Sequence, residues 1–203
     1  MSASRGESDV DRVARHAAGL IETGQASRVG EAIRHAMESL GVDEAAKPSF
    51  AAVRKHAQAM AMQAMGEAGY RQSRLAILRI AEELMTALEQ VGCEAVLVGR
   101  AAAGHLDADA KLHLRLYTDA SMADLAASVV EFGYEEPAFD TVETMYGRLS
   151  RMRFVEAGVP IVLTRCPPAI HIDRHVDAFA GKSIASMTVQ ELRRWIESAP
   201  GAA

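Results

Sequence analysis

The chain has 203 residues, of which 49% are hydrophobic and 24% charged, and its net charge is -5. This length and composition suffice for a stable core and exclude wholesale disorder, and the negative charge argues against a surface devoted to nucleic acid. No apolar run approaches the roughly 20 residues that cross a bilayer, and the N-terminus lacks the apolar stretch of a signal peptide, so we expect a cytoplasmic protein without a membrane partner.

The first part of the chain shows helical spacing of apolar residues throughout. Two short amphipathic stripes end before Gly24 and Gly41. Glycine favours such ends because it can adopt the left-handed backbone conformation that closes a helix. Ser49 can cap a third helix, which the region of Gly66 interrupts, and a fourth stripe ends near Gly92. The pattern therefore predicts four helices before any strand.

The later part of the chain changes to the spacing of strands. Residues 93–98 form a short continuous apolar run, and residues 111–117 alternate between apolar and polar side chains. Ser121 can cap a following helix, and a hairpin is predicted with its turn at residues 157–158. A T-x-x-E capping box at Thr188 begins a last helix. The prediction is a small sheet with flanking helices.

Helices first and strands afterwards predict an α+β fold. We expect an N-terminal helical region, residues 1–70, packed on a domain with a small mixed β-sheet and flanking helices, residues 71–200. The hairpin over residues 10–41 also fits a helix-turn-helix, although its second helix offers few groups to a DNA groove, so nucleic acid is not the favoured partner. A homodimer, if one forms, is expected through the N-terminal helices, whose methionines suit an adaptable contact.

A glycine, two acids and a lysine follow one another around the first two predicted strands. Gly99 and Arg100 come directly after the buried strand, and Asp107, Asp109 and Lys111 come before the alternating one. Convergent carboxylates hold the Mg²⁺ ions that nucleotidyl transfer requires. The order resembles the DNA polymerase beta type nucleotidyltransferase superfamily, in which a Gly-Ser pair precedes a strand carrying Asp-x-Asp.

The departures from that pattern are as informative as the match. Arg100 stands where the superfamily has its phosphate-binding serine, and Lys111 stands where the second metal carboxylate belongs. The expected third strand, residues 159–165, contains no acid, so Asp109 alone survives, with Asp107 as a substitute. An ammonium group at this place repels a divalent cation. We therefore expect a catalytically degenerate active site.

A second resemblance covers most of the chain. The helical hairpin, the Lys47-Pro48-Ser49 helix start, the x-L-H-L strand and the closing G-K-x-x-x-x-M-x-x-x-E-L helix are similar to a group of uncharacterised proteobacterial proteins with the nucleotidyltransferase fold. The second acid is usually absent from that group as well. The resemblance implies the fold and leaves the activity open.

These observations favour a nucleotide- or phosphate-binding module, or a regulatory interaction module, that needs no cofactor. The predicted anion contacts are Gly99, Arg100, Lys111, His113 and Arg115. One alternative is an active nucleotidyltransferase, in which Asp107 and Asp109 are the catalytic acids and bind Mg²⁺. Another is a purely structural protein-interaction module whose basic residues bind no ligand.

Overall fold

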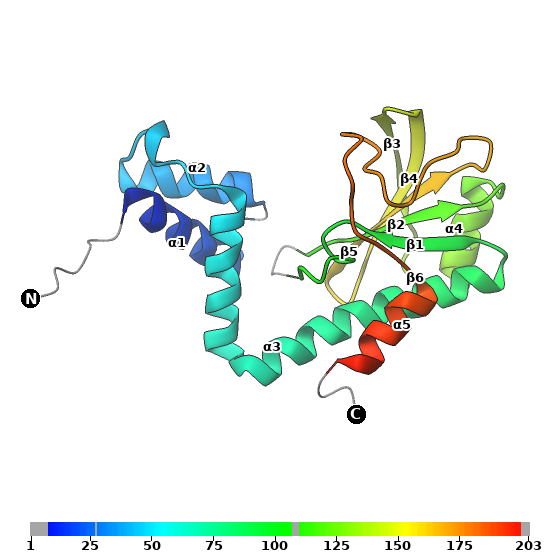
Figure 1. Cartoon of the computed structure of the whole chain (residues 1–203), viewed down its shortest axis with the longest axis horizontal. Helices are drawn as coiled ribbons and strands as arrows, with labels where there is room; N and C mark the ends of the chain where they lie inside the picture. Colours follow the sequence, from blue (N-terminus) through cyan, green and yellow to red (C-terminus); the bar gives the residue numbers. More distant parts are fainter. Residues whose placement is uncertain (1–7, 27, 107–109, 200–203) are drawn as a thin grey trace, which may run out of the picture. The chain divides into compact units, whose positions relative to one another are not determined.

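The computed structural model describes residues 8–26, 28–106 and 110–199 (Figure 1). It contains five α-helices and a six-stranded mixed sheet among these residues, so the predicted α+β fold is confirmed. Between Arg71 and Gln72 the chain passes from one compact unit to another. The first is called the helical unit and the second the sheet unit, and each is described by itself. No described helix is both long and apolar enough to span a bilayer.

The helical unit is built from three helices and a short 3-10 turn. They are α1 (Asp9–Glu22), α2 (Val29–Leu40), η1 (Glu44–Ala46) and the first part of α3 (Phe50–Gln90). The sequence predicted the ends of α1 and α2 to within a few residues because the glycines that follow them are strong stop signals. At the end of α2 this is Gly41, whose φ of 63° is left-handed.

The core of the helical unit consists mainly of small side chains. Small residues on facing helices allow close approach of the backbones, and the buried side chains are accordingly short. The buried members are Val13, Ala14, Ala17, Ala18, Ala26, Val29, Ala32, Ile33, Ala36, Ala46, Val53 and Ala57.

The long helix α3 contains one residue with non-helical backbone angles, Gly66, at φ 72° and ψ 164°. A side chain would strain this conformation, whereas glycine adopts it readily. The predicted interruption near Gly66 is confirmed, although the helical assignment continues on both sides of it.

The sheet has the strand order β3-β4-β5-β2-β1-β6. Its strands are β1 (Glu94–Val98), β2 (Leu112–Tyr117), β3 (Ala138–Thr144), β4 (Gly147–Glu156), β5 (Val159–Cys166) and β6 (Ser186–Thr188). Strands β2 and β5 run parallel, and every other pair of neighbours is antiparallel. Strands β3 and β6 were not predicted from the sequence. Strand β3 lies at an edge and lacks a clean apolar alternation, and β6 has only three residues.

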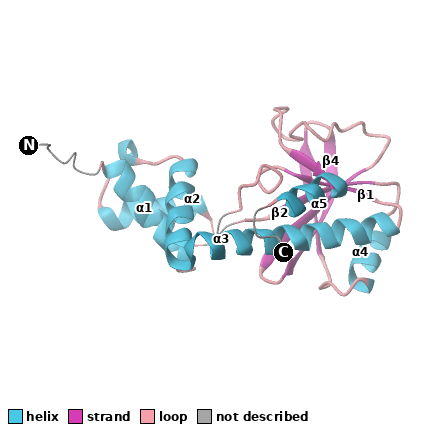
Figure 2. Cartoon of the chain, turned by 60° about the horizontal axis from the view of Figure 1, so that its bottom comes forward, coloured by secondary structure: helices cyan, strands magenta, loops and turns pink. Residues whose placement is uncertain are grey.

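One face of the sheet is covered by helices: the second part of α3, α4 (Met122–Glu131) and α5 (Val189–Ser198) (Figure 2). Both predicted capping boxes are present. Ser121 begins α4 and Thr188 begins α5, each with a carboxylate three residues later that accepts from the backbone of the cap. Leucines dominate the core between helices and strands. Its fully buried members include Leu78, Leu84, Leu88, Leu97, Leu112, Leu114, Leu116 and Leu125.

The opposite face of the sheet is covered in part by residues 167–185, the orange segment that crosses the strands in Figure 1. This segment has no helix or long strand. It packs through Ile172 against Leu149 and Cys166 in a small separate apolar cluster. It therefore contacts the face of β2 that carries the polar side chains, and this face contains the predicted site.

Candidate anion-binding site

The turn after β1 is shaped by Gly99, whose φ is 77°. Its backbone N–H donates to the carbonyl of Ala185 at 2.8 Å. We expected backbone N–H groups of this turn to face a bound anion, but the N–H of Gly99 is already used within the protein. Arg100 follows at the same end of the β1–β2 ladder, next to the start of β2, and it also takes part in an interaction inside the protein.

The three basic or titratable residues predicted on β2 have different environments. Lys111, immediately before the strand, and His113 are exposed. Arg115 is only 6% exposed, and its Nη1 donates to the carbonyl oxygen of Asp173 at 3.0 Å. Arg115 therefore anchors the segment that covers this face, and only Lys111 and His113 are open to a ligand.

Two arginines of β4 face the same side of the sheet as His113. Arg153 and His113 are both direct partners of Val162 in β5, one from each side, and Arg151 and Arg115 flank the next same-face residue of that strand. Directly opposed residues in a ladder share a face, and two strand spacings separate the flanking positions by roughly 10 Å. Basic side chains thus form two columns, on β2 and β4, with uncharged residues of β5 between them.

We call Lys111, His113, Arg151 and Arg153 the basic face. A single carboxylate lies beside it on β3. Asp140 accepts hydrogen bonds from Nε and Nη2 of Arg151 at 3.0 and 2.7 Å, and Nη2 of Arg153 lies 3.1 Å from the same carboxylate. The hydrogen bond from Arg151 is the main reason that the pKa of Asp140 is lowered. Among the residues that the structure describes, one negative charge thus faces two guanidinium groups, which leaves an excess of positive charge.

The pKa of His113 reports the electrostatic environment at the centre of this face. It is lowered from 6.5, first by partial burial of the ring and then by the positive charges of Lys111 and Arg151. Burial penalises a charge of either sign, whereas the contribution of Lys111 and Arg151 shows that the potential here is positive. The same potential favours an anion.

The predicted metal ligands, Asp107 and Asp109, lie outside the described residues. Among the described residues, no three His, Cys, Asp or Glu side chains are grouped so that they could hold a metal ion. Strand β5, which pairs with β2, carries no acid. Asp140 shares the face but lies three strands from β2, which is about 14 Å at the usual strand spacing.

Sequence reasoning found the β2 half of the basic face and missed the β4 half. Arg151 and Arg153 alternate with the buried Met152 and Phe154, and this alternation is visible in the sequence. Their proximity to His113 depends on the strand order β4-β5-β2. The parallel pairing of β2 with β5 is a long-range contact that no local pattern announces.

No protein-family model matches the sequence, and comparisons with curated proteins and with solved structures give no significant match.

Proposed function

We propose that the protein binds a phosphorylated small molecule, such as a nucleotide, on the basic face, and that it does so without a metal ion. The observation that carries the proposal is the convergence of Lys111, His113, Arg151 and Arg153 on one side of the sheet, where Asp140 is the one carboxylate bonded to them within residues 110–199. Lysine and arginine are the usual phosphate ligands, and arginine can bind two phosphate oxygens at once.

The spacing of the two columns suits an anion of the size of a phosphate group. The columns are roughly 10 Å apart. Lysine and arginine side chains are long enough to lean over the short residues of β5, so one phosphate can accept hydrogen bonds from Lys111 on one side and Arg153 on the other. The buried guanidinium of Arg115 adds positive potential beneath this place.

Anion binding is coupled to the protonation of His113. The pKa of His113 is lowered from 6.5 by burial and neighbouring cations, and a bound anion removes part of that penalty. Binding should therefore raise this pKa. By linkage, affinity should increase as the pH falls from the raised pKa of the complex to the pKa of the free protein, which lies below 6.5. Sulfate is a suitable probe because it stays doubly negative over this range, whereas a phosphate group gains a proton.

Isothermal titration tests the proposal with sulfate and with ATP, each with and without EDTA. We expect binding that EDTA does not change and that weakens about tenfold in Lys111→Gln and in Arg153→Gln, because each removes a charge-assisted hydrogen bond. Arg148→Gln is the matched control. Arg148 lies on the same strand as Arg153, with its side chain on the opposite face, and pairs with Glu143.

Three results would contradict the proposal. A strict Mg²⁺ requirement for ATP binding would favour a metal site. Transfer of labelled nucleotide from ATP that disappears in Asp109→Ala would establish a nucleotidyltransferase. Equal binding by the wild type, Lys111→Gln and Arg153→Gln would mean that the basic face carries no ligand and that the protein is a structural module.

A further inference from the structure

The sheet ends in an edge strand with free backbone groups. Strand β3 is the last strand in the sheet order, and its pairing with β4 begins at the two-residue turn between Thr144 and Gly147. In an antiparallel pair the backbone groups of alternate residues point toward and away from the partner strand. With Thr144 facing β4, the N–H and C=O groups of Phe139, Thr141 and Glu143 point away from it. None of these three residues makes a backbone hydrogen bond to another described element.

A groove lies beside this free edge, on the helix-covered side of the sheet. It has a volume of about 480 Å³ and runs between α4 and the start of β3. Its walls are largely apolar, with Ala126, Ala127 and Val130 from the helix and Phe139 from the strand. Val130 is 47% exposed and Phe139 is 55% exposed, although both are large hydrophobic residues. The groove and the edge can therefore be filled together by one extended chain.

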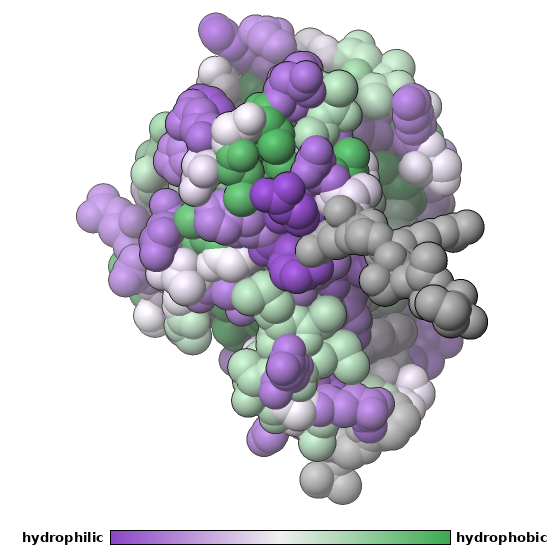
Figure 3. All heavy atoms as spheres, turned by 90° about the vertical axis from the view of Figure 1, so that its left-hand side faces the viewer, coloured by the Kyte–Doolittle hydropathy of each residue, from purple (hydrophilic) through white to green (hydrophobic). Residues whose placement is uncertain are grey.

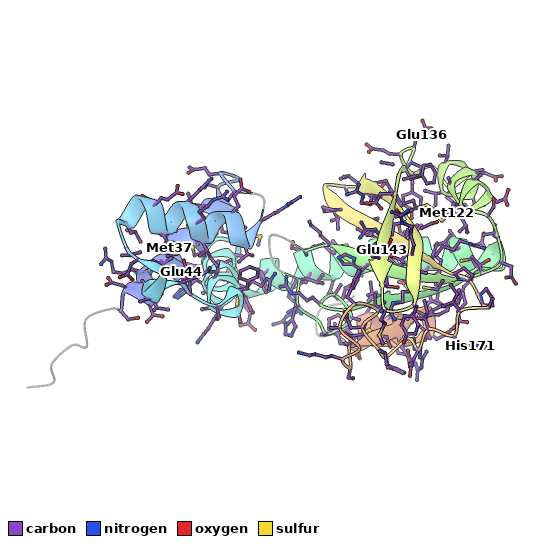
Figure 4. All side chains as sticks on the ribbon, turned by 90° about the horizontal axis from the view of Figure 1, so that it is seen from above. Met37, Glu44, Met122, Glu136, Glu143 and His171 are labelled. Carbon is purple, nitrogen blue, oxygen red and sulfur yellow. The ribbon has the colours of Figure 1, made fainter. Side chains whose placement is uncertain are left out.

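The rim of the groove is acidic. Glu131 and Glu136 line it, and neither has an ion-pair or hydrogen-bond partner among the described residues. Figure 4 shows Glu136 beside α4, at the outer end of the sheet unit. Two unpaired carboxylates next to exposed apolar side chains favour a ligand that combines apolar and basic residues.

We propose that β3 and this groove bind an extended peptide segment of a partner protein, in which a lysine or arginine stands two positions from an apolar residue. The peptide adds a strand to the sheet through the free backbone groups of Phe139, Thr141 and Glu143. One apolar side chain enters the groove against Val130 and Phe139, and a basic side chain two positions along the peptide, on the same face of the added strand, pairs with Glu131 or Glu136. Strand addition of this kind takes affinity from backbone hydrogen bonds and specificity from alternate side chains.

A second copy of the chain fits this site less well. If two β3 strands paired about Thr141, Phe139 of one would face Glu143 of the other. Strand β3 contains no lysine or arginine, so it brings no cation to Glu131 or Glu136. The surface is also separate from the basic face, because Phe139 and Asp140 point to opposite sides of the sheet. This inference therefore does not depend on anion binding.

Selection from a displayed library of short random peptides on the full-length protein tests the proposal. We expect enriched peptides with an apolar residue and, two positions away, lysine or arginine. Their affinity, measured by fluorescence anisotropy, should fall about tenfold when a central contact is removed. Ala127→Trp fills the groove, and its matched control is Ala123→Trp, which lies on the same helix at an exposed position outside the groove.

Two further variants separate the backbone and charge contributions. Thr141→Pro removes one outward N–H at an edge position, where proline is tolerated best, and should weaken every selected peptide. Glu131→Lys with Glu136→Lys should weaken the basic peptides, whereas two similar reversals at the exposed Glu38 and Glu197 should not. Circular dichroism of each variant establishes that it is folded.

Each remaining outcome would overturn the proposal. These outcomes are no enriched peptide, peptides without basic residues, or equal binding by Ala127→Trp and Ala123→Trp. Concentration-dependent self-association that Thr141→Pro abolishes would assign the edge to a second copy instead. Sulfate binding should be unchanged in all these variants, so failure here is distinguishable from failure of the anion site.

Discussion

Each of the two units has a core of its own, and the two cores are built from different side chains. In the helical unit, eight of the twelve buried core residues are alanine. In the sheet unit, leucines and other large side chains fill the space between the helices and the strands. Burial contributes about 0.8 kcal/mol for each CH₂ group removed from water, so an alanine core gains much less per residue. We therefore expect the helical unit to be the weaker one.

The two units also contain ion pairs that join residues at different separations along the chain. In the helical unit, Arg12 pairs with Asp9 and Lys47 pairs with Glu44, in each case three positions apart along the chain. In the sheet unit, Arg151 reaches Asp140 across strands and Arg193 of α5 reaches Glu82 of α3. These two pairs of the helical unit are local in sequence, whereas the two pairs of the sheet unit form only when that unit is folded. In Figure 3 the apolar residues of the visible face form separate groups among polar ones.

The largest expected effect is a cavity in the leucine core. Leu84 of α3 is fully buried, and Leu84→Ala should lower the free energy of unfolding by about 3 kcal/mol. Trp195, the single tryptophan, packs against this core and reports it by fluorescence during urea unfolding. The control is Leu40→Ala, at a half-exposed position in the helical unit, which should leave the tryptophan transition in place. Equal shifts of the tryptophan unfolding transition in the two variants would contradict separate cores.

A smaller effect is expected from overfilling the alanine core. Ala17 of α1 is fully buried, and Ala17→Leu should cost about 2 kcal/mol because there is no space for the added methylenes. Helical circular dichroism should then show an early unfolding step that the fluorescence of Trp195 does not show. A single transition seen equally by both probes would mean that the two units unfold together, and the comparison of two cores would be wrong.

The third effect concerns a helix cap in the sheet unit. The hydroxyl of Thr188 accepts from the N–H of Glu191, and the backbone N–H of Thr188 donates to the carboxylate at 2.7 Å. Thr188→Ala should destabilise the protein by about 1 kcal/mol, as measured by urea unfolding. Ser121→Ala, the equivalent change at α4, should cost a similar amount. A cost near zero at both caps would show that packing alone fixes these helix ends.

The sequence sufficed for most helices and for the inner strands because their signals are local. The glycine after α2, the two capping boxes and the alternation of β2 each lie within a few residues of the element they define. The edge strand β3 gave no such signal, because exposure on both sides removes the apolar alternation. Its place could be known only from its pairing with β4.

The residues of the candidate site also fall into two groups, those that a local pattern predicts and those placed by long-range strand pairing. Lys111 and His113 follow from the pattern of β2, whereas Arg151 and Arg153 reach this face through β5. Arg115 shows the opposite error: the alternation placed it correctly on the face, but the segment at Asp173 covers it. Coverage by a distant loop is a tertiary property, so exposure could not be predicted from the strand alone.

The smallest effect on stability is expected from Asp140→Asn, a substitution that also tests the basic face. Asp140→Asn removes the carboxylate that Arg151 and Arg153 share, and a partly exposed ion pair of this kind contributes about 1 kcal/mol or less. The pKa of Asp140 is lowered from 3.8, chiefly by its hydrogen bond to Arg151, so the carboxylate stabilises the folded protein above pH 3.8 and loses that effect as the pH falls through the lowered pKa. The stability difference between wild type and Asp140→Asn should therefore be present at neutral pH and disappear in strong acid.

Sulfate affinity should change in the opposite direction to stability. Asp140→Asn leaves both guanidinium groups without their carboxylate, so the basic face becomes more positive and titration calorimetry should show tighter sulfate binding. Glu143→Gln is the matched control, because it frees Arg148 on the other face of the same two strands. Weaker sulfate binding in Asp140→Asn would mean that the carboxylate positions Arg151 and Arg153 for the anion, and its contribution to the site would then be geometric rather than competitive.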